Sequence, residues 1–113
     1  MRVNIKPLSC NDAWKGKRFK STAYKKYELD LLFLLPKFQL PEPPYEIYLK
    51  FYFSSAASDL DNPVKQILDI FQKKYGINDK HVYKLVVEKG KAEKGQEWFE
   101  FLILPYEPIV SPK

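Results

Sequence analysis

The sequence predicts an α+β fold: a single domain over residues 1–113, with a mixed four-stranded sheet and two helices in the order β-α-β-α-β-β. One observation behind this prediction is the two-residue alternation of residues 45–53, which is typical of a half-buried strand. A second is the helical spacing of apolar residues in two other segments. The third is the length of 113 residues, which lies near the commonest domain size, without a shift in composition that would divide the chain.

The first half of the chain predicts one strand and one helix. Residues 2–8 alternate in polarity around Val3 and Ile5, as in a short strand, and Pro7 indicates that this strand ends there or lies at an edge. A helix is expected to begin after a cap at Ser21 or Thr22 and to stop at Pro36. Its predicted apolar positions are Tyr24, Tyr27, Leu31 and Leu34.

Four prolines between residues 36 and 44 predict an extended connector. The strand at 45–53 follows, and the second helix comes next. We expect Asn62 to be the N-cap of that helix, Pro63 to be its first residue and Gly76 to form its C-terminal cap. The apolar positions expected to be buried are Val64, Ile67, Leu68 and Phe71.

Two further strands are expected at residues 82–89 and 97–104. The segment between them, GKAEKG, is rich in turn residues and predicts a hairpin. The tail from residue 105 contains three prolines and is expected to be peripheral.

Composition limits the function classes. The longest apolar run, residues 31–35, is far shorter than the roughly 20 residues that cross a bilayer. Because the N-terminus also lacks an apolar signal-peptide core, we expect a soluble, cytoplasmic protein without a membrane partner. The single cysteine, Cys10, cannot form an internal disulfide, and with the lone His81 it is a poor catalytic pair.

The net charge of +5 permits nucleic-acid binding without requiring it. Its distribution is uneven, because residues 15–26 contain six basic residues, no acidic residue, and the aromatic Phe19 and Tyr24. This segment is either a solvated surface or a phosphate-binding one. The candidate DNA-binding residues in it are Lys15, Lys17, Arg18 and Lys20.

Asp59 and Asp61 form the main candidate for chemistry. In extended backbone two residues of the same parity project to the same side, so these carboxylates could share a cation such as Mg²⁺. Lys65, in the first helical turn, could stabilise charge on a phosphate there, and Asp79 is a third candidate carboxylate. The alternative is ordinary helix capping, with Asp69 and Lys65 paired at i, i+4 on a wet face.

Other catalytic signatures are missing from the sequence, which has no glycine-rich phosphate loop, no Cys/His zinc spacing and no HExxH motif. The segments DLDNPVK and QILDIFQKKYGINDKHV, with KPLSCNDAWKGKRFKSTAYKKYE upstream, resemble the RusA family of Holliday-junction resolvases, especially its phage and prophage members. Together these segments span residues 6–28 and 59–82.

The resemblance implies a homodimeric, Mg²⁺-dependent endonuclease of a bacterial, phage or prophage system, with Mn²⁺ as a substitute metal. Such an enzyme resolves four-way DNA junctions by paired symmetric nicks, in recombination and repair. Carried over by position, Asp59, Asp61 and Asp79 match the metal-binding carboxylates and Lys65 matches the catalytic lysine. The basic loop at 15–20 occupies the place of DNA-contacting charge.

The chain departs from the family pattern at two places. Ala56, Ala57 and Ser58 stand where many members have basic residues, and Asn78 stands where many have an acid beside the third carboxylate. Two rival functions remain open at this point. One is a junction-binding or DNA-binding protein without nuclease activity, and the other is a structural or adaptor protein whose lysines are solvated.

Overall fold

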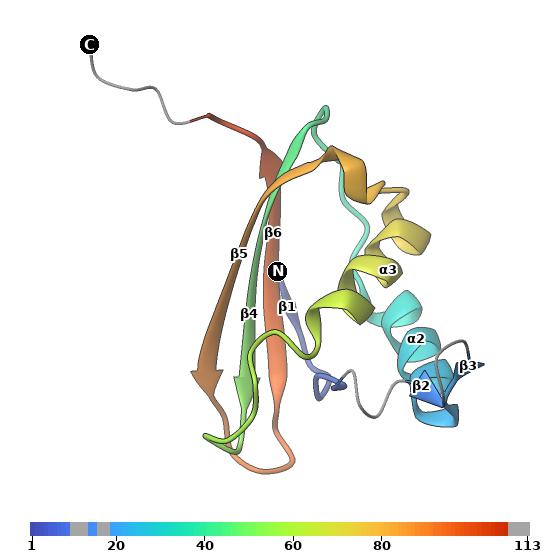
Figure 1. Ribbon diagram of the computed structural model, residues 1–113, viewed down its shortest axis with the longest axis vertical. Helices are drawn as coiled ribbons and strands as arrows, with labels where there is room; N and C mark the ends of the chain where they lie inside the picture. The colour runs from blue at the N-terminus through green and yellow to red at the C-terminus, as the bar shows by residue number, and fades with distance from the viewer. Residues whose placement is uncertain (10–13, 16–18, 109–113) are drawn as a thin grey trace.

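The computed structural model describes residues 1–9, 14–15 and 19–108, apart from the side chains of residues 14, 15 and 19. Its main sheet has the strand order β1-β6-β4-β5, and its two long helices, α2 and α3, cover one face of that sheet (Figure 1). The predicted mixed four-stranded sheet with two helices is therefore confirmed. The strands are β1 (Arg2–Val3), β4 (Tyr45–Phe53), β5 (Val82–Lys91) and β6 (Trp98–Pro105).

The central strand β4 has the bounds that the alternation predicts. It pairs in parallel with β5 and antiparallel with β6. The predicted hairpin between the last two strands is wrong, because β4 lies between them. The turn-rich segment instead crosses the end of β4, where the Ala92 N–H donates a 2.9 Å hydrogen bond to the Phe53 carbonyl. A turn composition shows that the chain reverses, but the pairing partner is decided by contacts distant in sequence.

The N-terminal strand is shorter than predicted. β1 pairs with β6 only over Arg2–Val3, after which the Ile5 N–H bonds to the Val3 carbonyl in a turn. Two further short strands lie where the sequence predicts a loop: β2 (Trp14–Lys15) and β3 (Phe19–Lys20) form an antiparallel pair.

The first long helix, α2, spans Thr22–Leu34 and is capped by Ser21, whose Oγ accepts a 3.0 Å hydrogen bond from the Tyr24 N–H. Three of its four predicted apolar positions are buried, but Leu34 is 43% exposed. Leu35 takes the place of Leu34 in the core, because the backbone becomes extended at this residue and turns its side chain inward.

The second helix, α3, spans Val64–Tyr75. The predicted N-cap is wrong: the cap position is Pro63, which makes no side-chain cap bond, and the Asn62 amide donates to Asp59 instead. The predicted C-terminal cap is confirmed, since Gly76 has a φ of 74° and its N–H bonds to the Gln72 carbonyl. Two residues of the predicted buried stripe, Ile67 and Phe71, are buried, and the other two, Val64 and Leu68, are half-buried. Gln66 and Ile70, which were not predicted, are also buried.

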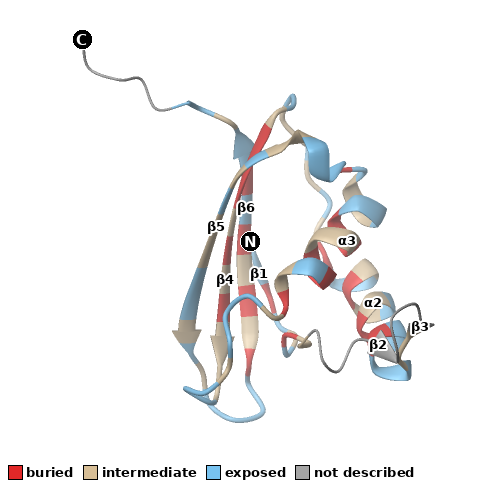
Figure 2. Cartoon of the chain, viewed as in Figure 1, coloured by how far each residue is buried: buried red, intermediate tan, exposed pale blue. Residues whose placement is uncertain are grey.

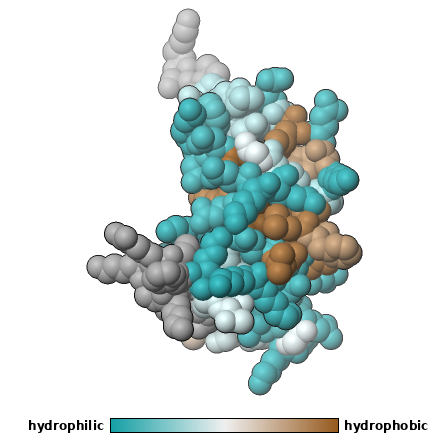
Figure 3. All heavy atoms as spheres, turned by 90° about the vertical axis from the view of Figure 1, so that its right-hand side faces the viewer, coloured by the Kyte–Doolittle hydropathy of each residue, from teal (hydrophilic) through white to brown (hydrophobic). Residues whose placement is uncertain are grey.

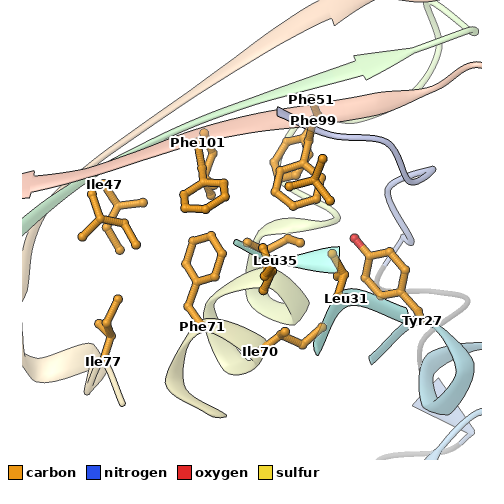
Figure 4. Packing of buried hydrophobic residues seen from close by; sticks show 14 of the residues in the cluster. Tyr27, Leu31, Leu35, Ile47, Phe51, Ile70, Phe71, Ile77, Phe99 and Phe101 are labelled. Atoms are coloured by element: carbon orange, nitrogen blue, oxygen red, sulfur yellow. The ribbon is translucent and has the colours of Figure 1, made fainter. Parts of the chain in front are cut away.

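The core lies between the helices and the sheet. Buried positions concentrate in β4 and β6 and on the parts of α2 and α3 nearest the sheet (Figure 2). Phe71 of α3 points toward Phe101 of β6, with ring centroids 4.9 Å apart, and Leu31 and Tyr27 of α2 extend the same layer (Figure 4). Within the described part of the chain, no helix is both long enough and apolar enough to span a membrane.

Candidate functional site

An open groove runs beside α3, toward the edge strand β5. Its volume is about 450 Å³. The polar side chains that line it are Asp61, Lys65, Asp69 and Asp79, and its apolar walls are Val64, Leu68, Leu85 and Val87. The structure thus brings Asp61, Lys65 and Asp79, three of the four predicted catalytic residues, to one groove.

The acidic residues enter the groove from different elements. Asp61 lies in the turn before α3, where its carbonyl accepts a 3.1 Å hydrogen bond from the Val64 N–H. Asp79 begins the short 3₁₀ helix η1 (Asp79–His81), whose cap is Asn78. Because α3 has 12 residues and rises about 1.5 Å per residue, the two aspartates flank a helix about 18 Å long. The groove is therefore elongated, with Asp69 between its ends.

Asp69 is a correction to the sequence analysis, which expected it to face water. It is half-buried and lines the groove. Burial raises the pKa of the Asp69 carboxyl, and the like charge of Asp79 raises it further, against the opposing charge of Lys65. The predicted attraction between Lys65 and Asp69 is thus present, but inside the groove. The four-residue spacing of positions 61, 65 and 69 is the signal that could have revealed this shared face.

Asp59 lies elsewhere. It lines a second cavity, of about 500 Å³, between the N-terminal segment, α2 and the loop before α3, with Lys6, Lys26 and Asp30 as further charged lining residues. The same-side argument for Asp59 and Asp61 requires extended backbone, whereas residues 60–63 form turns. The two carboxylates of the Asp-x-Asp motif therefore face different cavities.

The donor set suits a cation held by few protein ligands. Among the residues that the structure describes, no group of three or more His, Cys, Asp and Glu side chains is arranged to hold a metal ion. Mg²⁺ commonly uses only one or two carboxylates and completes its shell with waters and substrate phosphates. Asp69 and Asp79, whose charges interact, and Asp61 in the same groove fit that requirement.

The basic loop is only partly described. Lys17, Arg18 and Cys10 lie outside the described residues, and Lys15 is described by its backbone alone. Lys20 is engaged within the protein, because its Nζ donates a 2.8 Å hydrogen bond to Glu28.

Another lysine reaches the loop that precedes the aspartates. Lys89 of β5 is exposed, and its Nζ donates a 2.6 Å hydrogen bond to the Ala56 carbonyl. Positions 56–58 themselves carry no basic residue. Lys89 brings positive charge to that place from a distant strand, which the local sequence could not reveal.

No protein-family model and no curated protein sequence matches this chain. The resemblance to RusA-family resolvases therefore rests on the residues of segments 6–28 and 59–82.

Proposed function

We propose that this chain is a Mg²⁺-dependent endodeoxyribonuclease that resolves Holliday junctions or other branched DNA by paired symmetric nicks. The observation that carries the proposal is the groove beside α3, which is lined by Asp61, Lys65, Asp69 and Asp79. Carboxylates for a hard cation and a lysine for a phosphate are the groups that phosphodiester hydrolysis requires. The resemblance of residues 59–82 to the RusA motif supports the same chemistry.

In this proposal each polar side chain has a role. Asp69 and Asp79, whose charges interact, would hold the cation, with Asp61 toward the other end of the groove, and the cation would supply a Lewis acid at the scissile phosphate. Lys65 binds a phosphate oxygen and stabilises the negative charge that develops during attack, an effect worth a few kcal/mol when water is partly excluded. Asp59 stays a candidate ligand only from the resemblance, because the turn at residues 60–63 separates it from the groove.

The DNA partner and the dimer follow from the proposed substrate. A four-way junction has approximate two-fold symmetry, so paired nicks require two active sites that are related by the same symmetry. Lys15, Lys17 and Arg18 are the proposed phosphate contacts, together with Lys89 near the loop before α3. Lys20 is a weaker candidate than the sequence predicts, because Glu28 neutralises it.

A DNA-binding protein without nuclease activity is the second candidate. One observation favours it: among the described residues, no three His, Cys, Asp or Glu side chains are arranged to hold a metal ion together. The aspartates would then serve only the fold and the solubility of α3.

Incubation of the purified protein with a labelled four-way junction separates the two candidates. The enzyme nicks the junction in symmetric pairs in Mg²⁺, leaves it intact in EDTA, and spares a linear duplex of the same sequence. Metal-independent binding without product in Mg²⁺ or Mn²⁺ supports the second candidate.

A further inference from the structure

The face of the main sheet opposite the helices carries no described helix or strand (Figure 1). Side chains alternate between the two faces of a strand. Since Ile47, Leu49 and Phe51 are buried beneath the helices, their neighbours in β4 project from the opposite face. We call this surface the open face. It consists of Arg2, Glu46, Tyr48, Lys50, Tyr52, Lys84, Val86, Glu88, Trp98, Glu100, Leu102 and Leu104.

Strand register arranges the open face in rows that cross the sheet. The middle row is apolar and consists of Val86, Tyr48 and Leu102. Leu102 is 50% exposed, and Tyr48 and Val86 are half-buried. A hollow of about 420 Å³ lies beside this row.

The two rows that flank the apolar one carry the charges. On one side Lys84 stands next to Glu46. On the other side Glu88 stands next to Lys50, with 4.0 Å between the charged groups. The order of charges on β5 and β4 is therefore reversed from one flanking row to the other.

The open face is nearly balanced in charge, unlike the whole chain with its net charge of +5. Three basic side chains, Arg2, Lys50 and Lys84, accompany three acidic ones, Glu46, Glu88 and Glu100. Such a surface does not repel an identical surface, whereas its glutamates repel the phosphates of a nucleic acid.

The aromatic residues of the open face are also not arranged as a platform for bases. Tyr52 and Trp98 stack on each other, with centroids 3.8 Å apart and planes within 4°. The guanidinium of Arg2 lies 3.9 Å above the Trp98 ring. These contacts occupy the ring faces on which a base would stack.

We infer that the open face binds the open face of a second copy of this chain, related by a two-fold axis that runs across the strands along the apolar row. This axis places Lys84 opposite the partner's Glu88, a pair that occurs twice. Glu46 takes no part in it, because its carboxylate is buried and accepts hydrogen bonds from the Tyr48 hydroxyl and the Glu107 N–H. An axis along β4 would instead oppose Glu88 and the partner's Glu100, which repel. The inference rests on the dimer of the proposed function and names its surface.

A rival surface for self-association lies on α2. Hydrophobic residues form a patch on the helix side of the molecule (Figure 3). Leu29 and Phe33 are 69% and 87% exposed, respectively. Nothing in the described part of the chain shows what covers them. Phe33 therefore provides the control.

Sedimentation equilibrium of the purified protein, without DNA or metal, tests the inference by charge exchange. The wild type is expected to be a dimer. The single reversals Lys84→Glu and Glu88→Lys each oppose like charges twice and should raise the dimer dissociation constant at least tenfold. The double variant Lys84→Glu/Glu88→Lys restores opposite charges across the axis and should recover most of the lost dimer affinity. Circular dichroism checks that each variant is folded.

Phe33→Ser should leave the dissociation constant within about twofold of the wild type. A monomeric wild type, a double variant no tighter than the single ones, or dissociation caused by Phe33→Ser overturns the inference. The inference is also overturned if Trp98→Ala weakens binding of single-stranded DNA but leaves self-association unchanged. A stable dimer that cuts no junction contradicts only the nuclease proposal. A dimer that cuts the junction, and whose dissociation constant is unchanged by Lys84→Glu and by Glu88→Lys, contradicts only this one.

Discussion

Lys73 of α3 donates a 2.7 Å hydrogen bond to Glu28 of α2, which also accepts one from Lys20. Glu28 thereby joins both helices and the β2–β3 hairpin. Glu28→Gln removes the charge from a carboxylate that is mostly shielded from solvent. We expect it to lower the free energy of unfolding by about 1–2 kcal/mol at pH 7, measured by urea denaturation.

The effect of Glu28 should depend on pH with a definite sign. Burial alone would raise the pKa of the Glu28 carboxyl, but Lys20 and Lys73 outweigh it, so the pKa lies below its ordinary value. The stabilisation is therefore full above the unfolded pKa and is lost as pH falls through the lower folded pKa. A difference between wild type and Glu28→Gln that is the same at pH 7 and pH 3 contradicts this role.

Asp69 should show the opposite sign. Burial and the charge of Asp79 raise its pKa in the folded protein, so ionised Asp69 destabilises the fold at neutral pH. Asp69→Asn is expected to raise the free energy of unfolding at pH 7 by up to about 1 kcal/mol. The gain should shrink as pH falls through the folded pKa, since the wild-type carboxyl then becomes neutral. Urea denaturation of Asp69→Asn in metal-free buffer checks this, and destabilisation at pH 7 would contradict it.

The core prediction uses two phenylalanines of different exposure. Phe71 is fully buried and packs against Phe101, whereas Phe33 is 87% exposed. Phe71→Ala should cost about 3–5 kcal/mol of stability because it leaves a cavity between α3 and the sheet. Phe33→Ala should change stability by less than about 0.5 kcal/mol. Equal effects in thermal or urea unfolding would show that α3 does not pack on the sheet as described.

Lys89 and Lys20 should differ in their contributions to DNA binding. Lys89 is exposed beside the loop before α3, whereas Lys20 is held by Glu28. Lys89→Gln is expected to weaken junction binding and to reduce the slope of log K against log salt by about 1, as for the loss of one phosphate contact. Lys20→Gln should leave this slope nearly unchanged and should instead lower the free energy of unfolding. A slope that responds to Lys20 and not to Lys89 would contradict the assignment.

Local patterns predicted the local features of the fold. The strand at 45–53 and the Gly76 cap follow from alternation and backbone freedom within a few residues. The neighbours of each strand do not follow from such patterns, because β4 separates two strands whose connection looks like a hairpin. The strands that pair with the two edges of β4 are selected by the apolar side chains that become buried when they pair. Those side chains are distant in sequence.

The candidate site was predictable in part for the same reason. Asp61 and Lys65 are recognisable from their local spacing and Asp79 from the family resemblance, and the three residues line one groove. The separation of Asp59 was not foreseen, because side-chain parity holds only while the chain stays extended. Asp69 was misjudged because helical spacing shows which residues share a face, but not whether that face borders the sheet.

The most direct test of the central claim compares Asp61→Asn and Asp79→Asn with the wild type on a labelled four-way junction in Mg²⁺. The matched control is Asp30→Asn, which removes an aspartate that pairs with Lys26 outside the groove. Both groove variants should bind the junction within about threefold of wild-type affinity and lose at least a hundredfold in cleavage rate, while Asp30→Asn cuts normally. Cleavage at the wild-type rate by Asp61→Asn and Asp79→Asn would contradict the assignment of the groove as the active site.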